Sequence, residues 1–506
     1  MKNLNWRDDM SKYEQNIKKA KEIINIQRYY ESNAGLMQWD LWQGLSKDGM
    51  KYRQEVSGYF IKEQSKLIAN YETKKLVEYF REIDENKYQN IYDKAIARIL
   101  TRRYDDSVRT PIDLQMEMSS FISKAQMVWK EAMKNADFDL YKPYLKQMFE
   151  LKTKIAQAID NTKNPFDVLL NSVDEGLTVE KTDQLFSELK NGIISILPKI
   201  KDKYAAIDKS VLKVDCNKEI IRKISTQIVE STYFDKNKVT YWEVIHPVCV
   251  VVGPDDIRIT SYFNDLFPSI FGMLHECGHG VYSYSSNPKA VEYGIWGGIN
   301  GAMHESQGRF YENQIGRSKE FWEHFYPLLQ SEIEEFKKMD LDTFYNALIK
   351  VEPSLNRITA DEFTYSLHPI IRFEMEKLYF DGKLKTEDFY EAWNAKYKEY
   401  LGIEPKNAKE GVLQDVHWAS GHVGYSQSYA LGNLYCGQFR NAMLKDIPDV
   451  YQQIAKGDYS ALNKWSYDNI YQYGNLYTPQ ELIIKATGEE LKSKYFIEYL
   501  DEKFGH

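Results

Sequence analysis

Two histidines and a glutamate form the pattern with the clearest chemical meaning in this sequence, His275-Glu276-Cys277-Gly278-His279. Residues four apart on a helix share a face, so the two imidazoles can reach one metal ion. The glutamate between them then lies beside that ion and can accept a proton from water. This spacing is typical of zinc peptidases, but a five-residue pattern also arises by chance, so its context must support it.

A catalytic zinc needs a third protein ligand and leaves one position for water. Glu305 is the first candidate, because the 26 residues that separate it from His279 allow a loop and a second helix to return its carboxylate to the metal. The neighbouring His304 is the alternative, although a histidine beside a ligand more often forms a hydrogen bond behind it. Eight of the nine histidines lie between positions 246 and 422, which concentrates titratable chemistry there.

Three other interpretations compete with a catalytic metal. Cys277 is a possible nucleophile, but its place between the two histidines argues against that role. A structural zinc site is usually closed by four ligands, often cysteines, and the four cysteines here are far apart without a Cys-X-X-Cys pair. This cysteine usage fits a reduced, cytoplasmic setting. A non-enzymatic helical scaffold with a degenerate site is the third alternative, and the complete ligand set argues against it.

Composition excludes several classes of protein. The chain has 506 residues, 43% of them hydrophobic, and a net charge of −8 with interleaved signs. A nucleic-acid partner is not expected, because no basic face is implied. A membrane partner is not expected either, because no apolar run approaches the roughly 20 residues that a spanning helix needs. The first ten residues contain no apolar signal segment.

The periodicity predicts a mainly α fold with a small sheet directly before the metal-binding helix. Mixed-charge segments with apolar residues at helical spacing predict helices over 10–34, 55–82, 89–104, 114–135 and 139–162. Short β-branched segments predict strands over 238–245, 248–252 and 257–260. The metal helix is expected over 269–283, with Pro268 in its first turn. No linker is evident, so residues 1–506 are expected to form a single catalytic unit folded as two helical lobes.

Further motifs flank the histidine pair in a fixed order. They are His246-Pro247, Asp256-Ile257-Arg258-Ile259-Thr260, His304-Glu305-Ser306-Gln307, Arg357-Ile358-Thr359-Ala360-Asp361 and Gly411-Val412-Leu413-Gln414-Asp415-Val416-His417-Trp418. Together they resemble the carboxypeptidase Taq family of zinc metallocarboxypeptidases, whose motifs read HPF, DxRxT, HExxH, HES-Q, IRxxAD and GxxQDxHW. The segment Gln38-Trp39-Asp40, followed by Arg53, is also similar. The resemblance runs from about residue 24 to the end.

Three motifs depart from the family pattern. Val248 replaces the phenylalanine of HPF, Asn356 replaces the isoleucine of IRxxAD, and Ser426-Gln427 replaces the Phe-Pro of GYFPTY. Both tyrosines of the last motif remain, as Tyr425 and Tyr429. These departures leave the preferred C-terminal residue of the substrate open.

The resemblance implies one Zn²⁺ per chain, which Co²⁺ or Mn²⁺ can replace, and a role for each matched residue. The metal ligands are His275, His279 and Glu305, and Glu276 is the general base. Arg357 holds the terminal carboxylate of the substrate, because its planar fork gives a carboxylate two hydrogen bonds. The oxyanion donors are Tyr425 first, then Tyr429 and His417. The remaining residues are substrate-binding (His246, Gln414, Asp415) or supporting (Asp256, Arg258, His304, Asp361).

Two of these pairs also have a purely structural interpretation. Asp256 and Arg258 are two apart on a strand, so they share a face and can pair with each other. Arg357 and Asp361 are four apart, and on a helix they would form a surface pair of little energetic value.

The implied fold is similar to the neurolysin and angiotensin-converting-enzyme group of gluzincins, with residues 1–210 roofing a deep groove and residues 211–506 carrying the site. The implied reaction is release of single C-terminal amino acids, with broad specificity, from peptides that have a free C-terminus. The alternative is a zinc oligoendopeptidase or dipeptidyl carboxypeptidase of the same fold. A homodimer is expected from the family.

Overall fold

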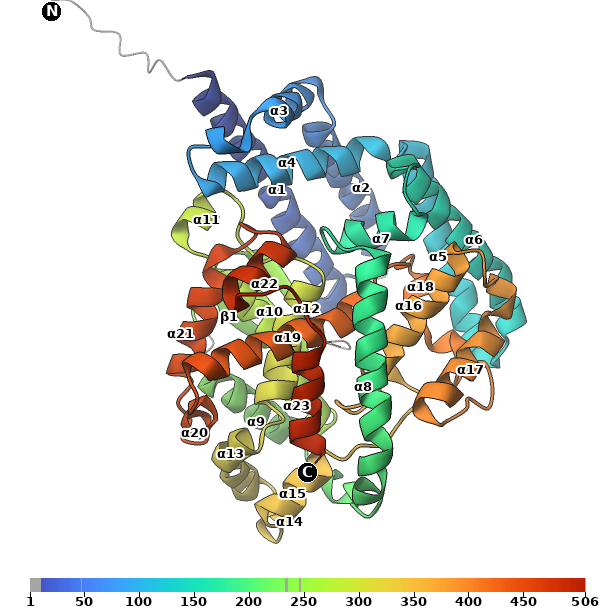
Figure 1. Ribbon diagram of the computed structural model, residues 1–506, viewed down its shortest axis with the longest axis vertical. Helices are drawn as coiled ribbons and strands as arrows, with labels where there is room; N and C mark the ends of the chain where they lie inside the picture. The colour runs from blue at the N-terminus through green and yellow to red at the C-terminus, as the bar shows by residue number, and fades with distance from the viewer. Residues whose placement is uncertain (1–10, 47, 233–234, 245–246, 506) are drawn as a thin grey trace, which may run out of the picture.

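The computed structural model describes residues 11–46, 48–232, 235–244 and 247–505, and most of them are helical. The long helix α8 (Val179–Ala205) runs down the middle of the molecule (Figure 1). It packs against α23 (Lys494–Phe504) and against α16 (Leu367–Phe380). The predicted mainly α fold with a small sheet is confirmed, whereas the division into two lobes around a groove stays a prediction.

The first part of the chain is a series of helices. At one end of the molecule, α1 packs against α2 and α4 (Figure 1). The bounds are α1 (Lys12–Gln43), α2 (Gly49–Ile68), α3 (Tyr71–Glu82), η1 (Glu85–Lys87), α4 (Ile91–Arg109), α5 (Ile112–Asn135), α6 (Phe138–Ile159), α7 (Pro165–Val173), η2 (Lys209–Leu212) and α9 (Lys218–Ser231).

One predicted helix is wrong. The segment 55–82 forms two helices, α2 and α3, because Asn70 interrupts it. The Asn70 side chain accepts the backbone N–H of Thr73 at 2.8 Å, which is the hydrogen bond of an N-cap and starts a new helix.

The second part of the chain follows the sheet and is again helical. The bounds are α10 (Leu266–Tyr284), α11 (Pro288–Glu292), α12 (Ala302–Arg309), η3 (Phe310–Ile315), α13 (Lys319–Glu332), α14 (Glu334–Lys337), α15 (Leu341–Leu348), η4 (Arg357–Thr359), η5 (Thr386–Asp388), α17 (Phe389–Leu401), η6 (Val412–Gln414), α18 (Val416–Ala419), α19 (Gln427–Asp446), α20 (Val450–Ile454), α21 (Ser460–Asn469), η7 (Tyr471–Tyr473) and α22 (Pro479–Thr487). Among the described residues, no helix combines the length and apolar character needed to cross a membrane.

The sheet lies between the metal helix and the N-terminal helix. Its central strand β3 (Asp256–Ser261) pairs in parallel with β1 (Val239–Glu243) and antiparallel with β2 (Val248–Gly253). Ile257 and Ile259 point toward α10, where Gly280 lets them approach closely. On the other face, Trp39 of α1 packs against Val250 and Val252 of β2. Helix α10 therefore rests on a layer that α1 supports from behind.

Close helix contacts bring α10, α12 and α19 together. A Cβ atom at Gly278 of α10 would lie 2.3 Å from the carbonyl oxygen of Gln307 in α12. A Cβ atom at Gly432 of α19 would lie 2.8 Å from Cγ of Glu305. Such separations are shorter than van der Waals contact, so only glycine fits at either position. The three helices can therefore approach more closely than side chains normally allow.

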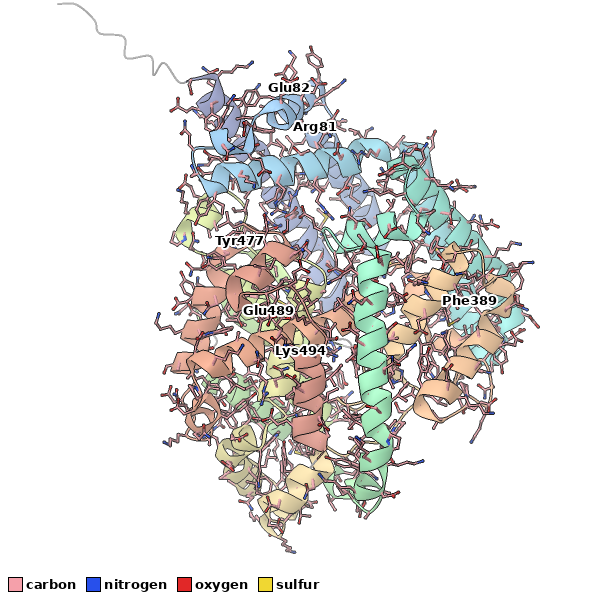
Figure 2. All side chains as sticks on the ribbon, viewed as in Figure 1. Arg81, Glu82, Phe389, Tyr477, Glu489 and Lys494 are labelled. Carbon is pink, nitrogen blue, oxygen red and sulfur yellow. The ribbon has the colours of Figure 1, made fainter. Side chains whose placement is uncertain are left out.

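An aromatic cluster fixes the short helix α18 against the middle of α6. Phe389 (Figure 2) has its ring centroid 5.3 Å from that of Phe149 and 5.2 Å from that of Trp418. Trp418 is almost completely buried, and such rings dominate core energetics by the area they bury. The cluster therefore fixes the position of His417, which precedes Trp418 in α18.

We expect Gly278→Ala to lower the free energy of unfolding by about 1 to 3 kcal/mol, because the new methyl group must displace the α12 backbone. Gly58→Ala is the matched control, since Gly58 lies within α2 and an added Cβ meets nothing within 4 Å. There the change should stabilise the helix by up to about 1 kcal/mol. Urea unfolding of both variants measures the two changes, and equal effects would contradict the close approach.

Candidate metal centre

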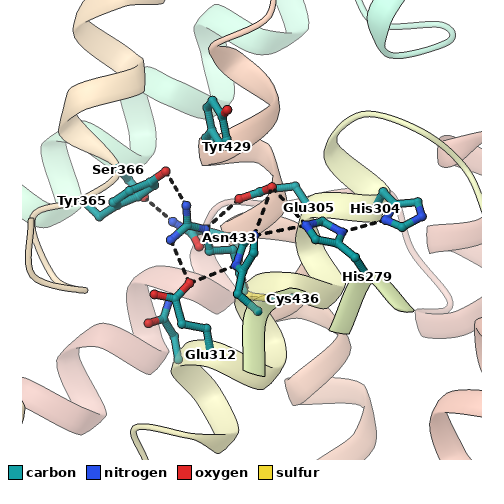
Figure 3. Close-up of polar contacts among 12 residues, drawn as sticks. His279, His304, Glu305, Glu312, Tyr365, Ser366, Tyr429, Asn433 and Cys436 are labelled. Atoms are coloured by element: carbon teal, nitrogen blue, oxygen red, sulfur yellow. Dashed lines mark hydrogen bonds and ion pairs between the residues drawn. The ribbon is translucent and has the colours of Figure 1, made fainter. Parts of the chain in front are cut away.

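Three side chains from two helices meet at one point. His275 and His279 of α10 have their Nε2 atoms 3.1 Å apart. The Oε2 atom of Glu305, on α12, lies 3.8 Å from the first of these and 3.7 Å from the second. Figure 3 shows the Glu305 carboxylate directed at the histidine rings. These are the residues that the sequence predicts as metal ligands.

Hydrogen bonds behind the rings determine where their protons lie. The Nδ1–H of His275 donates to Oε2 of Glu312 at 3.0 Å, because a carboxylate only accepts. His304 donates from Nε2 to the carbonyl oxygen of Gly297 at 3.2 Å. Burial lowers the pKa of His304 to about 4, so its ring is neutral and its Nδ1 accepts. The Nδ1 of His279, 2.7 Å away, must therefore donate to it.

Three candidate donor atoms consequently face one another. The Nε2 of His279 carries no proton in this tautomer, and the Glu305 carboxylate has none to give. Against the effect of burial, the carboxylates around His275 raise its pKa, so a bound metal ion would take the place of its Nε2 proton. Burial and the neighbouring His275 hold the pKa of His279 well below its ordinary value, which keeps this ring in the metal-binding form. Two ligands about 2.1 Å from one tetrahedral ion lie about 3.4 Å apart. The observed separations of 3.1 to 3.8 Å bracket that value, so this donor set fits a divalent metal ion.

Arg309, the last residue of α12, joins the carboxylates of Glu305 and Glu312. Its Nε donates to Oε1 of Glu305 at 2.8 Å, and its Nη1 donates to Glu312 at 3.2 Å. It also donates to the hydroxyl of Tyr365 and stacks on that ring, 3.9 Å from the centroid (Figure 3). Buried arginine forks of this kind fix the direction of a carboxylate. Arg309 thus leaves the other oxygen of Glu305 directed at the histidines.

Glu276 lies on α10 between the two histidines and is partly buried. Burial raises its pKa to about 7; His275 opposes this effect and the Glu305 carboxylate adds to it. A carboxyl group with a pKa near the working pH can both accept and release a proton. A bound cation would lower this pKa again.

A second group of side chains extends from Tyr365. The Nη1 of Arg357 donates to the Tyr365 hydroxyl at 2.7 Å, and its guanidinium lies 4.3 Å from the ring centroid of Tyr429. Tyr429 and His417 share a hydrogen bond of 3.2 Å between hydroxyl and Nε2. The Tyr425 ring stacks on the His417 ring at 6.1 Å. A continuous set of contacts therefore connects Glu305, through Arg309 and Tyr365, to Arg357, Tyr429, His417 and Tyr425.

Asp415 and Gln414 have structural partners. Buried Asp415 accepts from Nε of Arg372 at 2.5 Å and from the backbone N–H of Trp418 at 2.9 Å. Burial lowers the pKa of His417 to about 4 despite the Asp415 carboxylate nearby, so this ring is neutral. Gln414 donates to the backbone oxygen of Glu410 at 2.5 Å, a contact within its own loop.

Asp256 and Arg258 pair with each other, as the structural interpretation allowed. Two hydrogen bonds of 2.9 and 3.1 Å join them, and Arg258 lies over the ring of Trp39. His246 lies outside the described residues.

The helical pairing of Arg357 with Asp361 is wrong. Arg357 starts the short helix η4, which ends at Thr359, and Asp361 lies beyond it. Asp361 instead accepts from the backbone N–H and hydroxyl of Thr364 at 2.9 and 2.7 Å.

The sequence analysis did not predict a role for several residues that the structure places at or near this centre. Arg309 and Glu312 lie four and seven residues after Glu305, a spacing that places charged groups on one helix face and was available as a signal. Tyr365 gave no local signal, because its role depends on two arginines that are distant from each other in sequence. Glu376 is a further example. It is fully buried and accepts from Nε1 of Trp418 at 2.7 Å and from the N–H of Gly424 at 3.0 Å.

Metal-dependent hydrolysis of peptides is the chemistry that this donor set supports, and comparison with known proteins defines the class. Residues 19–504 match the model of the family described as carboxypeptidase Taq (M32) metallopeptidase. The chain belongs to this family and is a metallocarboxypeptidase, which confirms the resemblance, the enzyme class and the activity predicted from the motifs.

The relatives cover nearly the whole chain. Carboxypeptidase 1 of Bacillus subtilis is 33% identical over 488 residues, which span 96% of this chain and 97% of the relative. Thermostable carboxypeptidase 1 of Pyrococcus furiosus is 31% identical and spans 92% of this chain and 94% of its own length. The crystal structure of the M32 carboxypeptidase of Deinococcus radiodurans superposes with a TM-score of 0.92 at 27% identity, covering 97% of this chain and 99% of that one.

We predict that Glu376 makes stability decrease as pH rises. Burial raises its pKa to about 8, well above its value in an unfolded chain. The folded state therefore binds the extra proton between about pH 5 and 8, and the free energy of unfolding falls across this window. In Glu376→Gln that fall should shrink by at least about 1.4 kcal/mol, which corresponds to one unit of pKa.

Glu374, on the same helix, is the matched control of opposite sign. Burial favours its neutral form, but ion pairs with Lys396 and Lys190 dominate and lower its pKa. The contribution of Glu374 to the free energy of unfolding is therefore present above the pKa of this group in the unfolded chain, and it is lost as pH falls. Urea unfolding of wild type, Glu376→Gln and Glu374→Gln from pH 4 to 9 measures both trends. A wild-type and a Glu376→Gln profile that run parallel would contradict the prediction.

Proposed function

We propose that the chain is a zinc-dependent carboxypeptidase that releases single amino acids, with broad specificity, from peptides with a free C-terminus. One observation carries this proposal. Arg357 shares the Tyr365 hydroxyl with Arg309, which in turn holds the metal-ligand candidate Glu305. A group suited to binding a carboxylate is thus held a few side chains from the candidate metal.

His275, His279 and Glu305 would hold the ion, and a bound Zn²⁺ would lower the pKa of a water molecule and polarise the scissile carbonyl. Two imidazoles and a carboxylate suit zinc, although Co²⁺ and Mn²⁺ bind similar ligands. Glu276 takes the proton of the attacking water and passes it to the leaving amine.

Hydrogen-bond donors are also needed where negative charge develops on the scissile carbonyl oxygen. We assign this role to Tyr425 first, with Tyr429 and His417 as the other candidates. Burial raises the pKa of Tyr425 to about 12, and it raises the pKa of Tyr429 as well, so both phenols keep their protons at neutral pH. The Tyr429 hydroxyl is also near the His417 ring, whereas Tyr425 only stacks on that ring, which supports ranking Tyr425 first.

Other parts of the proposal concern the whole molecule. We assign residues 1–506 to a single catalytic unit in which about the first 210 residues cover a substrate groove. His246, Gln414 and Asp415 contribute to substrate binding, and Asp256, Arg258, His304 and Asp361 support the site. A cytoplasmic homodimer completes the proposal; the four free cysteines agree with a reducing compartment.

Peptides with free or amidated C-termini test the direction of cleavage. We expect mass spectrometry to show losses of one residue at a time from the free peptide and none from the amidated one. Arg357→Ala should lower kcat/KM on the free peptide about 10- to 100-fold, the range for losing charged hydrogen bonds. Internal fragments, or release of dipeptides, would instead support an oligoendopeptidase or a dipeptidyl carboxypeptidase.

Two substitutions separate metal binding from proton transfer. Glu276→Gln should bind zinc in full but lose about 10²- to 10⁴-fold in kcat, because the amide cannot accept the proton. His275→Ala should lose both the metal and the activity. His324→Ala on α13 is the control and should keep both. Metal analysis by mass spectrometry with peptide kinetics measures each variant, and an active Glu276→Gln enzyme would refute the mechanism.

A further inference from the structure

Asp174 is a buried carboxylate that the mechanism above does not use. It directly follows α7, in the N-terminal part of the chain, and its side chain is only 4% exposed. One oxygen accepts the backbone N–H of Ala302 at 2.6 Å. The other accepts the hydroxyl of Ser428 at 2.7 Å and the amide of Gln427 at 3.4 Å.

The partners of Asp174 begin the two helices on which the candidate site depends. Ala302 is the first residue of α12, and Glu305 follows three residues later. Ser428 lies in the first turn of α19, next to Tyr429. These two helices also pack together along their length. A single carboxylate therefore joins the start of the helix that carries a metal-ligand candidate to the start of the helix that carries Tyr429.

The backbone at this junction is shaped for close approach. Gly301 precedes α12 with a φ of 70°, a region that side chains rarely adopt. A Cβ atom at Gly301 would lie 2.2 Å from the carboxylate of Asp174 and 3.0 Å from the carbonyl oxygen of Val173. The start of α12 is therefore held directly against Asp174 without room for adjustment.

Electrostatics distinguish Asp174 from an ordinary polar contact. Burial raises its pKa, and its three hydrogen-bond partners are all uncharged. A buried carboxylate is expensive unless its surroundings stabilise it. The positive end of the α12 dipole provides part of this stabilisation, because the carboxylate binds the first N–H of that helix.

We infer that Asp174 is a positioning residue for the metal centre. By joining the starts of α12 and α19, it places Glu305 opposite the histidine pair of α10. This inference rests on the metal role proposed for Glu305. Loss of the Asp174 carboxylate should weaken metal binding and slow turnover in a protein that still folds. Loss of a purely local cap would affect stability alone.

Asp167 supplies a matched control. It lies on α7, seven residues before Asp174, and accepts the N–H of Val179, the first residue of α8, at 2.7 Å. Like Asp174, it binds the first backbone N–H of a helix through a carboxylate oxygen, but it is less buried and no candidate site residue lies on α8. Asp174→Asn and Asp167→Asn therefore compare two carboxylates that each cap the start of a helix. Only the helix capped by Asp174 carries a candidate site residue, Glu305.

The experiment measures zinc affinity by competition with a chromogenic chelator, together with kcat, KM and thermal unfolding. We expect Asp174→Asn to bind zinc about 10-fold or more weakly, the range seen when groups behind metal ligands are removed. Its kcat should fall while KM changes little. Asp167→Asn should match wild type in zinc affinity and kcat. Ser428→Ala, which removes one of the three hydrogen bonds, should give a smaller loss in the same direction.

Two outcomes would overturn the inference. If Asp174→Asn loses thermal stability to the same extent as Asp167→Asn yet keeps full zinc affinity and kcat, Asp174 is only a cap. If Asp174→Asn does not fold, unchanged zinc affinity in Ser428→Ala would overturn the inference equally. Glu305→Gln separates this failure from that of the proposed function. A Glu305→Gln protein with wild-type zinc affinity refutes the metal assignment itself, whereas a weakened one leaves only the role of Asp174 refuted.

Discussion

The convergence of three buried metal-donor candidates is the constraint on which the rest of this structure depends. The Nε2 atoms of His275 and His279 and one oxygen of Glu305 lie within 3.8 Å of one another. Without a cation such an arrangement is unfavourable, so the surrounding protein must hold the groups in place. Glu312, His304 and Arg309 do so by occupying the opposite side of each ligand. The centre is thus built from pairs of groups, one directed at the metal position and one behind it.

Small residues make that convergence possible. Gly278 and Gly432 allow α12 to contact α10 and α19 without intervening side chains, and a Cβ at Gly308 would meet the His275 ring at 2.7 Å. Behind α10, the sheet and Trp39 of α1 complete the support. The metal centre therefore depends on packing between residues as far apart in sequence as Trp39 and Gly432, although its candidate ligands lie within 31 positions.

Local patterns predicted the fold class and the candidate ligands, because helical spacing places residues i and i+4 on one face regardless of the rest of the protein. The same reasoning failed where a side chain competes with the backbone. Asn70 divides a predicted helix by capping its second half, and Asn356 accepts the N–H of Ile358 to start a short turn that ends before Asp361. Tyr365 and Asp174 were not predicted, because their partners are brought together only by the tertiary fold.

The Tyr365 hydroxyl accepts hydrogen bonds from two arginines, one belonging to each half of the site. Three connected side chains thereby set a fixed interval between the metal position and the group suited to a terminal carboxylate. If Arg357 binds the terminal carboxylate as proposed, this interval would select the length of one amino acid. None of the positions at which this chain departs from its family, Val248, Asn356, Ser426 and Gln427, is one of these three side chains, although Asn356 adjoins Arg357.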